Sequence, residues 1–204
     1  ETAGNADWQI DSDQPTPLPA QSGITGATSE SFWTGANSAW GVQLVKRGYT
    51  VATLTTAYGI TYGNAGNAYD LSNYDLFIIN EPNTMFTRAE STAIYNYLAA
   101  GGGIIAVCDH AGSDRDGDGV DSPRAYGRLD TQHRLGAHFD STGEANNSIS
   151  QNSSNVETSL SDSLIHGSAG IADSLAYHSG TTMTLFASAN ASVKAHVWMN
   201  GTAH

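Results

Sequence analysis

The sequence predicts an α/β fold, a flavodoxin-like doubly wound sheet with parallel core strands. Strand-like and helix-like segments alternate between residues 29 and 134, an order typical of βαβ units rather than of a β-sandwich. The segment 74–80 (YDLFIIN) is a continuous apolar run, as in strands buried on both faces of a parallel sheet. With 204 residues, of which 39% are hydrophobic, the chain can form one sizeable core, so we expect a single domain over 1–204.

Local patterns divide this domain into elements. The predicted elements are, in order, a helix at 29–47, strands at 49–55 and 74–80, a helix at 87–100, a strand at 104–108, a helix at 122–134, and short strands at 182–187 and 193–198. Thr87 and Glu90 have the spacing of a capping box, and Ser122 with Pro123 is typical of an N-cap and first turn. An irregular N-terminal arm is expected at 1–28 and a polar loop region at 136–164.

Two features indicate that the sheet lacks its own first strand. No convincing strand precedes the helix at 29–47, and the chain ends after a strand without a closing helix. We therefore expect a processed piece of a longer polypeptide. A propeptide, another segment of the same precursor or a partner chain would supply the strand, or the fold does without it.

Composition excludes several partners. Eight basic against twenty acidic residues give a formal charge of −12, which repels nucleic-acid phosphates and anionic lipid surfaces, so we expect neither nucleic acid nor membrane as a partner. No apolar run approaches the roughly 18 residues of a membrane span. Few Lys and Arg with many Gly, Ser, Thr and Asn favour a secreted, extracellular bacterial protein. A single cysteine, Cys108, excludes an internal disulfide.

The run YDLFIINEPNTMFTRAESTAIYNYLAAGGGIIAVCDHAG, residues 74–112, resembles the central part of the class I glutamine amidotransferase-like superfamily, in particular its trehalose-utilisation (ThuA-like) branch. In that branch a "YD" strand, an acid-capped helix and a "GGG" strand lead to a polar turn. The resemblance implies a flavodoxin-like sheet and a carbohydrate polymer as substrate. Amidotransferase relatives place a nucleophilic cysteine on a tight turn of the kind small-x-Cys-x-Gly. Here Cys108 keeps the cysteine, but His110 replaces the turn glycine.

Polar side chains follow two of the predicted strands. Glu81 and Asn83 come after 74–80, and Asp109 and His110 come after 104–108. Ligands of open α/β sheets bind beyond the carboxyl ends of the strands, so we expect these side chains to face a common crevice. A carboxylate beside an imidazole can serve as general base and acid, or the same groups can hold an activating metal. The alternative is that the carboxylates cap turns and the imidazole packs.

An aspartate ladder follows the second of these strands. Asp114, Asp116, Asp118 and Asp121 carry carboxylates at near-alternate positions, with Gly119 for a sharp turn. Alternation lets oxygens converge on a hard cation, as in the first half of an EF-hand loop. The twelfth position of such a loop is an alanine here rather than glutamate. We therefore predict calcium at a site that is not an EF-hand, with a solvated acidic turn as the alternative.

Three functions remain open on this sequence. The first is an exported hydrolase-like domain in which Asp109 and His110, assisted by Glu81, act on a small molecule or polysaccharide. His166 and His178 stand beside glycines and, with Asn83, are candidates for substrate binding. The second is a non-catalytic, calcium-stabilised binding module. The third is a cysteine-dependent amidase or peptidase.

Overall fold

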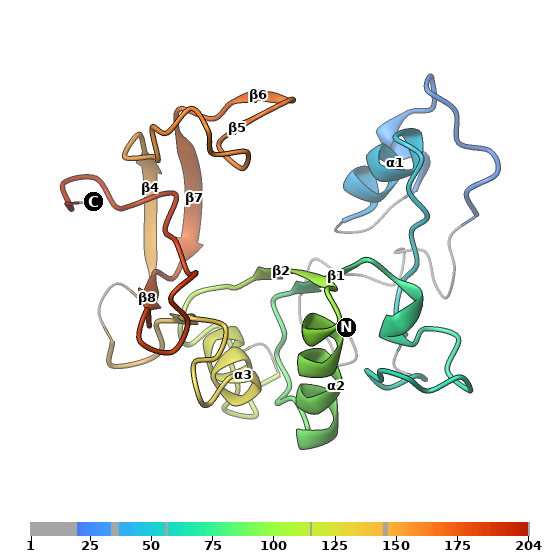
Figure 1. The fold of residues 1–204 in the computed structure, drawn as a ribbon, viewed down its shortest axis with the longest axis horizontal. Helices are drawn as coiled ribbons and strands as arrows, with labels where there is room; N and C mark the ends of the chain where they lie inside the picture. Colours follow the sequence, from blue (N-terminus) through green and yellow to red (C-terminus); the bar gives the residue numbers. More distant parts are fainter. Residues whose placement is uncertain (1–19, 34–36, 56, 115, 145–146, 204) are drawn as a thin grey trace.

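The computed structural model describes residues 20–33, 37–55, 57–114, 116–144 and 147–203, and it shows a mixed α/β fold (Figure 1). The helices are η1 (Glu30–Phe32), α1 (Ser38–Lys46), η2 (Leu71–Asn73), α2 (Arg88–Ala99) and α3 (Ser122–Leu129). The strands are β1 (Leu76–Asn80), β2 (Gly103–Val107), β3 (Ala137–Phe139), β4 (Ile149–Ser153), β5 (His166–Gly167), β6 (Gly170–Ile171), β7 (Leu175–Gly180) and β8 (Met183–Leu185). The predicted α/β class is confirmed.

The sheets are small. β1 and β2 form a parallel pair, in which Ile78 lies opposite Ile105. The other pairs, β3–β8, β4–β7 and β5–β6, are antiparallel. Each of these sheets has two strands within the described residues, so a doubly wound sheet is not seen there. The prediction of parallel core strands is confirmed for β1 and β2.

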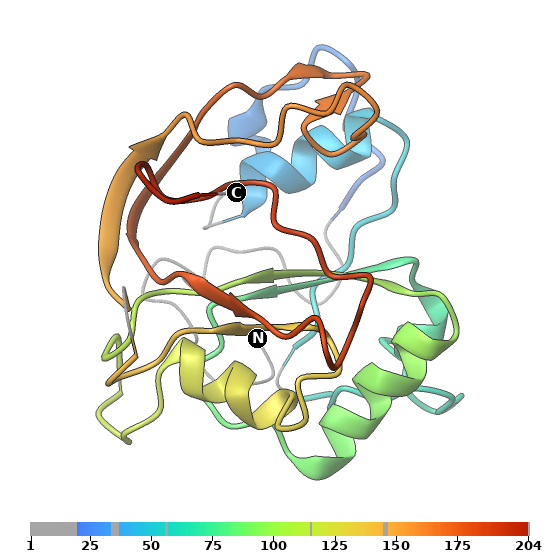
Figure 2. The same ribbon diagram turned by 60° about the vertical axis from the view of Figure 1, so that its left-hand side comes forward.

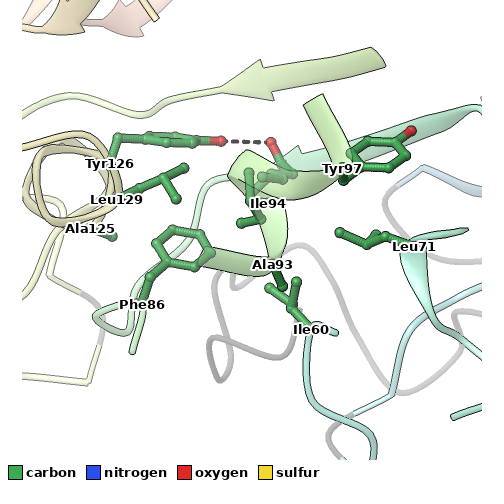
Figure 3. Close-up of a cluster of buried hydrophobic side chains, with 10 residues drawn as sticks. Ile60, Leu71, Phe86, Ala93, Ile94, Tyr97, Ala125, Tyr126 and Leu129 are labelled. Atoms are coloured by element: carbon green, nitrogen blue, oxygen red, sulfur yellow. Dashed lines mark hydrogen bonds between the residues drawn. The ribbon is translucent and has the colours of Figure 1, made fainter. Parts of the chain in front are cut away.

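The core lies on one face of the β1–β2 pair. Helices α2 and α3 both lie on that side (Figures 1 and 2), and the buried cluster joins them to β1 (Figure 3). Ile94 and Tyr97 of α2 are 0% and 2% exposed at its centre. On the opposite face Leu76, Ile105 and Val107 remain 43%, 36% and 36% exposed. Helices therefore cover one face of the β1–β2 pair, whereas the strands of a doubly wound sheet are covered on both faces.

Helix α2 begins as its sequence predicts. The Thr87 side chain accepts a hydrogen bond from the Glu90 N–H, and the Glu90 carboxylate accepts one from the Thr87 N–H, so the capping box is complete. For α3 the N-cap is Asp121 rather than Ser122, and its carboxylate accepts from the Arg124 N–H at 3.0 Å. Pro123 lies in the first turn, as predicted.

Several predicted elements differ in the structure. Residues 49–55 form no strand, because the Gln21 amide bonds both the N–H and the carbonyl of Val51 and takes the place of a strand partner. Residues 193–198 contribute one isolated bridge, from Val197 to Val156. The helix predicted over 29–47 is divided into η1 and α1, with 34–36 outside the described residues.

The ends of three predicted segments also change. Helix α3 stops at Leu129 instead of continuing to residue 134, because the Asp130 carboxylate accepts the N–H groups of Arg134 and Leu135. The expected loop 136–164 contains β3 and β4. Most of the irregular arm expected at 1–28 falls outside the described residues, which begin at residue 20. No helix in the described ranges is long and apolar enough to span a membrane.

Candidate functional site

The carboxyl ends of β1 and β2 are held together by Tyr126 of α3. Its hydroxyl lies 2.8 Å from the Ile79 carbonyl and 3.1 Å from the Val107 carbonyl, one from each strand (Figure 3). Glu81, the residue that follows β1, donates its N–H to the Val107 carbonyl at 2.9 Å. Helix α3 therefore fixes the point at which the polar residues after both strands emerge.

Glu81 has an unusual backbone conformation. Its φ is +45°, in the left-handed region that non-glycine residues rarely adopt, and the buried Pro82 follows it. A residue held in such a conformation costs free energy, and such residues gather at functional sites. No sequence pattern signals this conformation. The conformation marks the end of β1 as a candidate site independently of its charge.

The environment of the Cys108 thiol disfavours its ionisation. Burial raises the pKa of Cys108 most, and the negative charges of Asp121, Asp109 and Glu81 raise it further, whereas a hydrogen bond with Ser122 lowers it. The thiol therefore stays protonated at neutral pH, and the thiolate needed for nucleophilic attack is disfavoured. Cys108 is also not among the described residues with positive φ, so it does not occupy the tight turn of an amidotransferase nucleophile.

This environment predicts an unreactive thiol. Iodoacetamide should leave Cys108 unlabelled in the native protein and modify it in denaturant, because alkylation requires exposed thiolate. The measurement is intact mass with and without denaturant after equal exposure. Full labelling of the native chain would show instead that the thiol is accessible and ionised.

Asp109 and His110 adopt a defined local geometry. The Asp109 carboxylate accepts from the His110 N–H at 2.7 Å and from the Ser113 hydroxyl at 2.5 Å, and its side chain is 14% exposed. The His110 Nδ1 lies 2.8 Å from the Ala111 carbonyl. A carbonyl only accepts, so this contact places the proton of the neutral ring on Nδ1 and leaves the lone pair on Nε2.

The open nitrogen of His110 lies at the protein surface. Its Nε2 is 3.9 Å from Asp109 Oδ1, and the side chain is 32% exposed. That distance is too long for a hydrogen bond. The pair can therefore take up a proton from a bound molecule without first breaking a contact between the two side chains.

The predicted substrate-binding residues do not join this pair. Asn83 is 2% exposed, so it belongs to the interior rather than to the surface of a crevice. His166 lies on β5, with Nε2 at 3.4 Å from the Glu157 carbonyl. His178 lies on β7, and its Nδ1 is 3.2 Å from the Ser179 hydroxyl. Both histidines therefore belong to sheets other than β1–β2.

His178 does line a surface depression of about 420 Å³ between β4 and β7. The depression is lined by Ser150, Gln151, Asn152, Ala176, Tyr177 and His178. An aromatic ring among amide and hydroxyl groups can bind a polar ligand. The sequence signal, a histidine two residues before Gly180, did not reveal that neighbouring strands would build this surface.

The aspartate ladder forms a compact loop. Ligand oxygens of Asp114, Asp116 and Asp118 lie within 4.8 Å of one another. The Asp114 carboxylate accepts from the N–H groups of Gly117 at 2.8 Å and Gly119 at 2.7 Å. These bonds hold the pKa of Asp114 below its usual range, and the bond from the Gly119 N–H lowers it most. The three carboxylates fit a hard cation in number, charge and chemistry.

Asp121 has a different role from the other three aspartates. One carboxylate oxygen accepts from the Gly112 N–H at 2.6 Å and the other from the Arg124 N–H at 3.0 Å. It is 3% exposed and lies outside the ladder cluster. The predicted fourth calcium ligand is therefore a helix cap that ties the loop to α3.

A further group of metal-binding side chains was missed by the sequence analysis. His138, Asp140 and Glu144 place a ring nitrogen and two carboxylate oxygens within 4.8 Å of one another. Residues 138 and 140 share a strand face because side chains alternate, and Gly143 permits a turn that returns Glu144. Neither the HxH nor the HExxH spacing of common zinc sites describes this mixed set, whereas an HxD pair on a strand before a glycine turn would have been a usable signal.

Compared with known proteins, the chain matches no family model, and no curated protein or solved structure is significantly similar to it.

Proposed function

We propose that this chain is an exported, hydrolase-like α/β domain whose acid–base site consists of Asp109 and His110, assisted by Glu81. The observation that carries the proposal is the strained Glu81, at φ +45° directly after β1. The Glu81 N–H bonds the Val107 carbonyl at 2.9 Å, and Tyr126 lies within hydrogen-bond distance of both strands, so Glu81 and Asp109 emerge at the same edge of the β1–β2 pair. The same proposal includes a flavodoxin-like topology, a relationship to amidotransferase-like proteins and a secreted location.

His110 is the general base of the proposed reaction. Its Nε2 carries the lone pair, because Nδ1 donates to the Ala111 carbonyl at 2.8 Å. Proton transfer from a water or hydroxyl nucleophile creates an imidazolium, which the Asp109 carboxylate at 3.9 Å stabilises. Bonds from the His110 N–H and the Ser113 hydroxyl keep that carboxylate in place. Glu81 adds negative electrostatic potential at this site. As an alternative role, the carboxylates of Glu81 and Asp109 would be ligands for an activating metal.

We assign calcium to the ladder loop, with Asp114, Asp116 and Asp118 as ligands. Calcium bound by these oxygens would cancel the repulsion among three carboxylates that lie within 4.8 Å. The loop continues to Asp121, which caps α3, and α3 carries the Tyr126 hydroxyl that holds the two strand ends. Calcium would thus stabilise the loop beside the acid–base site. A polysaccharide is the substrate class implied by the ThuA-like resemblance.

A non-catalytic binding module is the second candidate function. Both oxygens of Asp109 bond groups within its own turn, as expected of a structural carboxylate. The depression between β4 and β7, with Tyr177 and His178, offers a separate surface for a polar ligand such as a glycan. The raised pKa of Cys108 disfavours the third candidate, a cysteine amidase.

Turnover of a substrate panel by matched variants tests the proposal. Purified chain would be assayed on polysaccharides, aryl glycosides and esters. His110→Ala and Asp109→Asn should each lower kcat/KM by about 100-fold or more, the usual contribution of a positioned acid or base. His196→Gln, at a histidine that pairs with Asp162 outside the proposed sites, is the control and should retain activity.

The outcomes of this assay separate the two candidate functions. Unchanged turnover in both site variants would remove Asp109 and His110 from the mechanism. Absence of turnover together with glycan binding that survives both changes, but is lost in Tyr177→Ala, would favour the binding module. Circular dichroism of every variant checks that the fold is intact.

A further inference from the structure

We propose that His138, Asp140 and Glu144 form a second metal site, specific for a divalent transition-metal ion of which zinc is the representative. One ring nitrogen and two carboxylate oxygens lie within 4.8 Å of one another. Zinc takes nitrogen and oxygen ligands at about 2.1 Å in a tetrahedron, which sets ligand atoms roughly 3.4 Å apart. The three donors can therefore meet that geometry through small side-chain adjustments.

The backbone explains why these residues meet. His138 pairs with Thr184 in the β3–β8 ladder, and Asp140 follows on the same strand face. The Glu144 N–H then donates to the Ser141 carbonyl at 3.0 Å, which closes a turn. Gly143 in that turn has φ +93°, a conformation that glycine adopts readily. The turn brings the Glu144 carboxylate back to 2.9 Å from His138 Nε2.

Asp140 supplies the strongest indication of a cation. It is only 5% exposed, and its carboxylate accepts from the hydroxyls of Thr182 and Thr184. Across the described ranges no lysine or arginine forms an ion pair with it. Buried charges in proteins are paired or bind metal. Two threonine hydroxyls orient the carboxylate without neutralising it, as outer-shell partners of a metal ligand do.

The contact between His138 and Glu144 fits the same interpretation. Carboxylate oxygens accept at 2.9 and 3.0 Å from His138 Nε2, so a proton bridges the two groups. A metal ion would replace this proton and bind both atoms. The imidazole ligand favours zinc and similar ions over calcium, which takes oxygen donors. This cluster and the aspartate ladder are therefore expected to select different metals.

A neighbouring histidine strengthens the case for a metal with nitrogen ligands. His133 stacks on Phe186, with ring centroids 3.8 Å apart, and its ring lies 5.6 Å from that of His138. The His133 Nδ1 is buried and has no hydrogen-bond partner in the part of the chain that the structure describes. A buried nitrogen without a partner is costly. Its ring nitrogens lie outside the 4.8 Å cluster, so His133 would have to shift to become a fourth ligand.

The site is connected to the loop that carries His110. The Asn147 side chain donates to the carbonyls of Ser141 and Glu144, at 3.0 and 3.1 Å. The Asn147 carbonyl accepts the Ala111 N–H at 2.8 Å. An ion that fixes the turn at 141–144 would therefore also restrain the residue next to His110. The metal site itself does not depend on that histidine being catalytic.

Zinc and cobalt titrations of the purified full-length chain test the proposal. Isothermal titration should give one zinc site per chain, and Co²⁺ should produce the visible d–d absorption of nitrogen-containing coordination. His138→Gln and Glu144→Gln should each weaken zinc binding by about 10- to 100-fold, the range found for disturbed metal sites. Asp118→Asn, in the aspartate ladder, is the matched control and should bind zinc like the unaltered chain.

Two results would overturn the proposal. One is equal zinc affinity in the unaltered chain and both variants, and the other is no zinc binding by the unaltered chain at millimolar concentration. Glu144 is 44% exposed in its side chain, so Glu144→Gln should fold even if a change at His138 does not. Melting temperatures measured with a chelator verify folding before each titration.

Discussion

Replacing Asp70 with alanine is expected to destabilise the protein by about 4 kcal/mol, because five hydrogen bonds to one buried carboxylate would be lost. Asp70 is 1% exposed. Its carboxylate accepts from the hydroxyls of Thr61 and Ser72 and from the N–H groups of Gly63, Asn64 and Ser72. A loss of this size is a large share of the 5–15 kcal/mol by which domains are usually stable.

The pH dependence of stability identifies the ionised carboxylate as the cause. Burial alone would raise the pKa of Asp70, but hydrogen bonds from Ser72, Thr61 and the backbone hold it well below its usual range. The unfolded chain has a pKa of about 3.9. The contribution of Asp70 is therefore fully present above that value and is lost as pH falls toward the folded-state pKa.

Urea unfolding at pH 7 and at pH 3 measures both effects. The difference in unfolding free energy between the unaltered chain and Asp70→Ala should be largest at pH 7 and should shrink at pH 3. Asp75→Asn, an exposed aspartate nearby, is the control and should cost less than about 0.5 kcal/mol. A pH-independent difference would show that packing, rather than the charged carboxylate, stabilises this loop.

Local signals in the sequence were sufficient where the interaction itself is local. The capping box of Thr87 and Glu90 and the proline in the first turn of α3 are present, since each depends on residues a few positions apart. Residues 49–55 show the limit of such signals. Their β-rich composition favours a strand, but a strand needs a partner, and Val51 bonds the Gln21 side chain instead. Gln21 lies thirty positions before Val51 in the sequence. No local pattern around residues 49–55 therefore reveals this contact.

In the candidate site, too, sequence patterns predict some features, whereas others depend on packing between distant residues. Placing Glu81 and Asp109 at neighbouring strand ends required only parallel pairing, and β1 and β2 do pair in parallel. The strain at Glu81 and the burial of Asn83 depend on packing that no pattern encodes. Asp121 was predicted to be a calcium ligand because its spacing continues the ladder. It became a helix cap because α3 begins at the next residue, Ser122, with Pro123 in its first turn.

Calcium is expected to raise the melting temperature of the chain by about 5–10 °C relative to a chelator. A ligand at one hundred times its Kd stabilises by about 2.7 kcal/mol, and each kcal/mol shifts Tm by about 2–4 °C for a domain of this size. The bound ion would remove the repulsion among Asp114, Asp116 and Asp118, whose oxygens lie within 4.8 Å. Differential scanning fluorimetry with calcium, magnesium or chelator measures the shift.

Matched variants assign that shift to the ladder. Asp118→Asn keeps an oxygen that can accept from the Val120 N–H, as Asp118 does at 2.8 Å, but removes one negative charge. It should lose most of the calcium response while its chelator Tm stays near that of the unaltered chain. Asp173→Asn, at an exposed position outside the ladder, should respond fully. Equal melting temperatures of the unaltered chain in calcium and chelator would mean that the loop is an acidic turn held by its own backbone bonds.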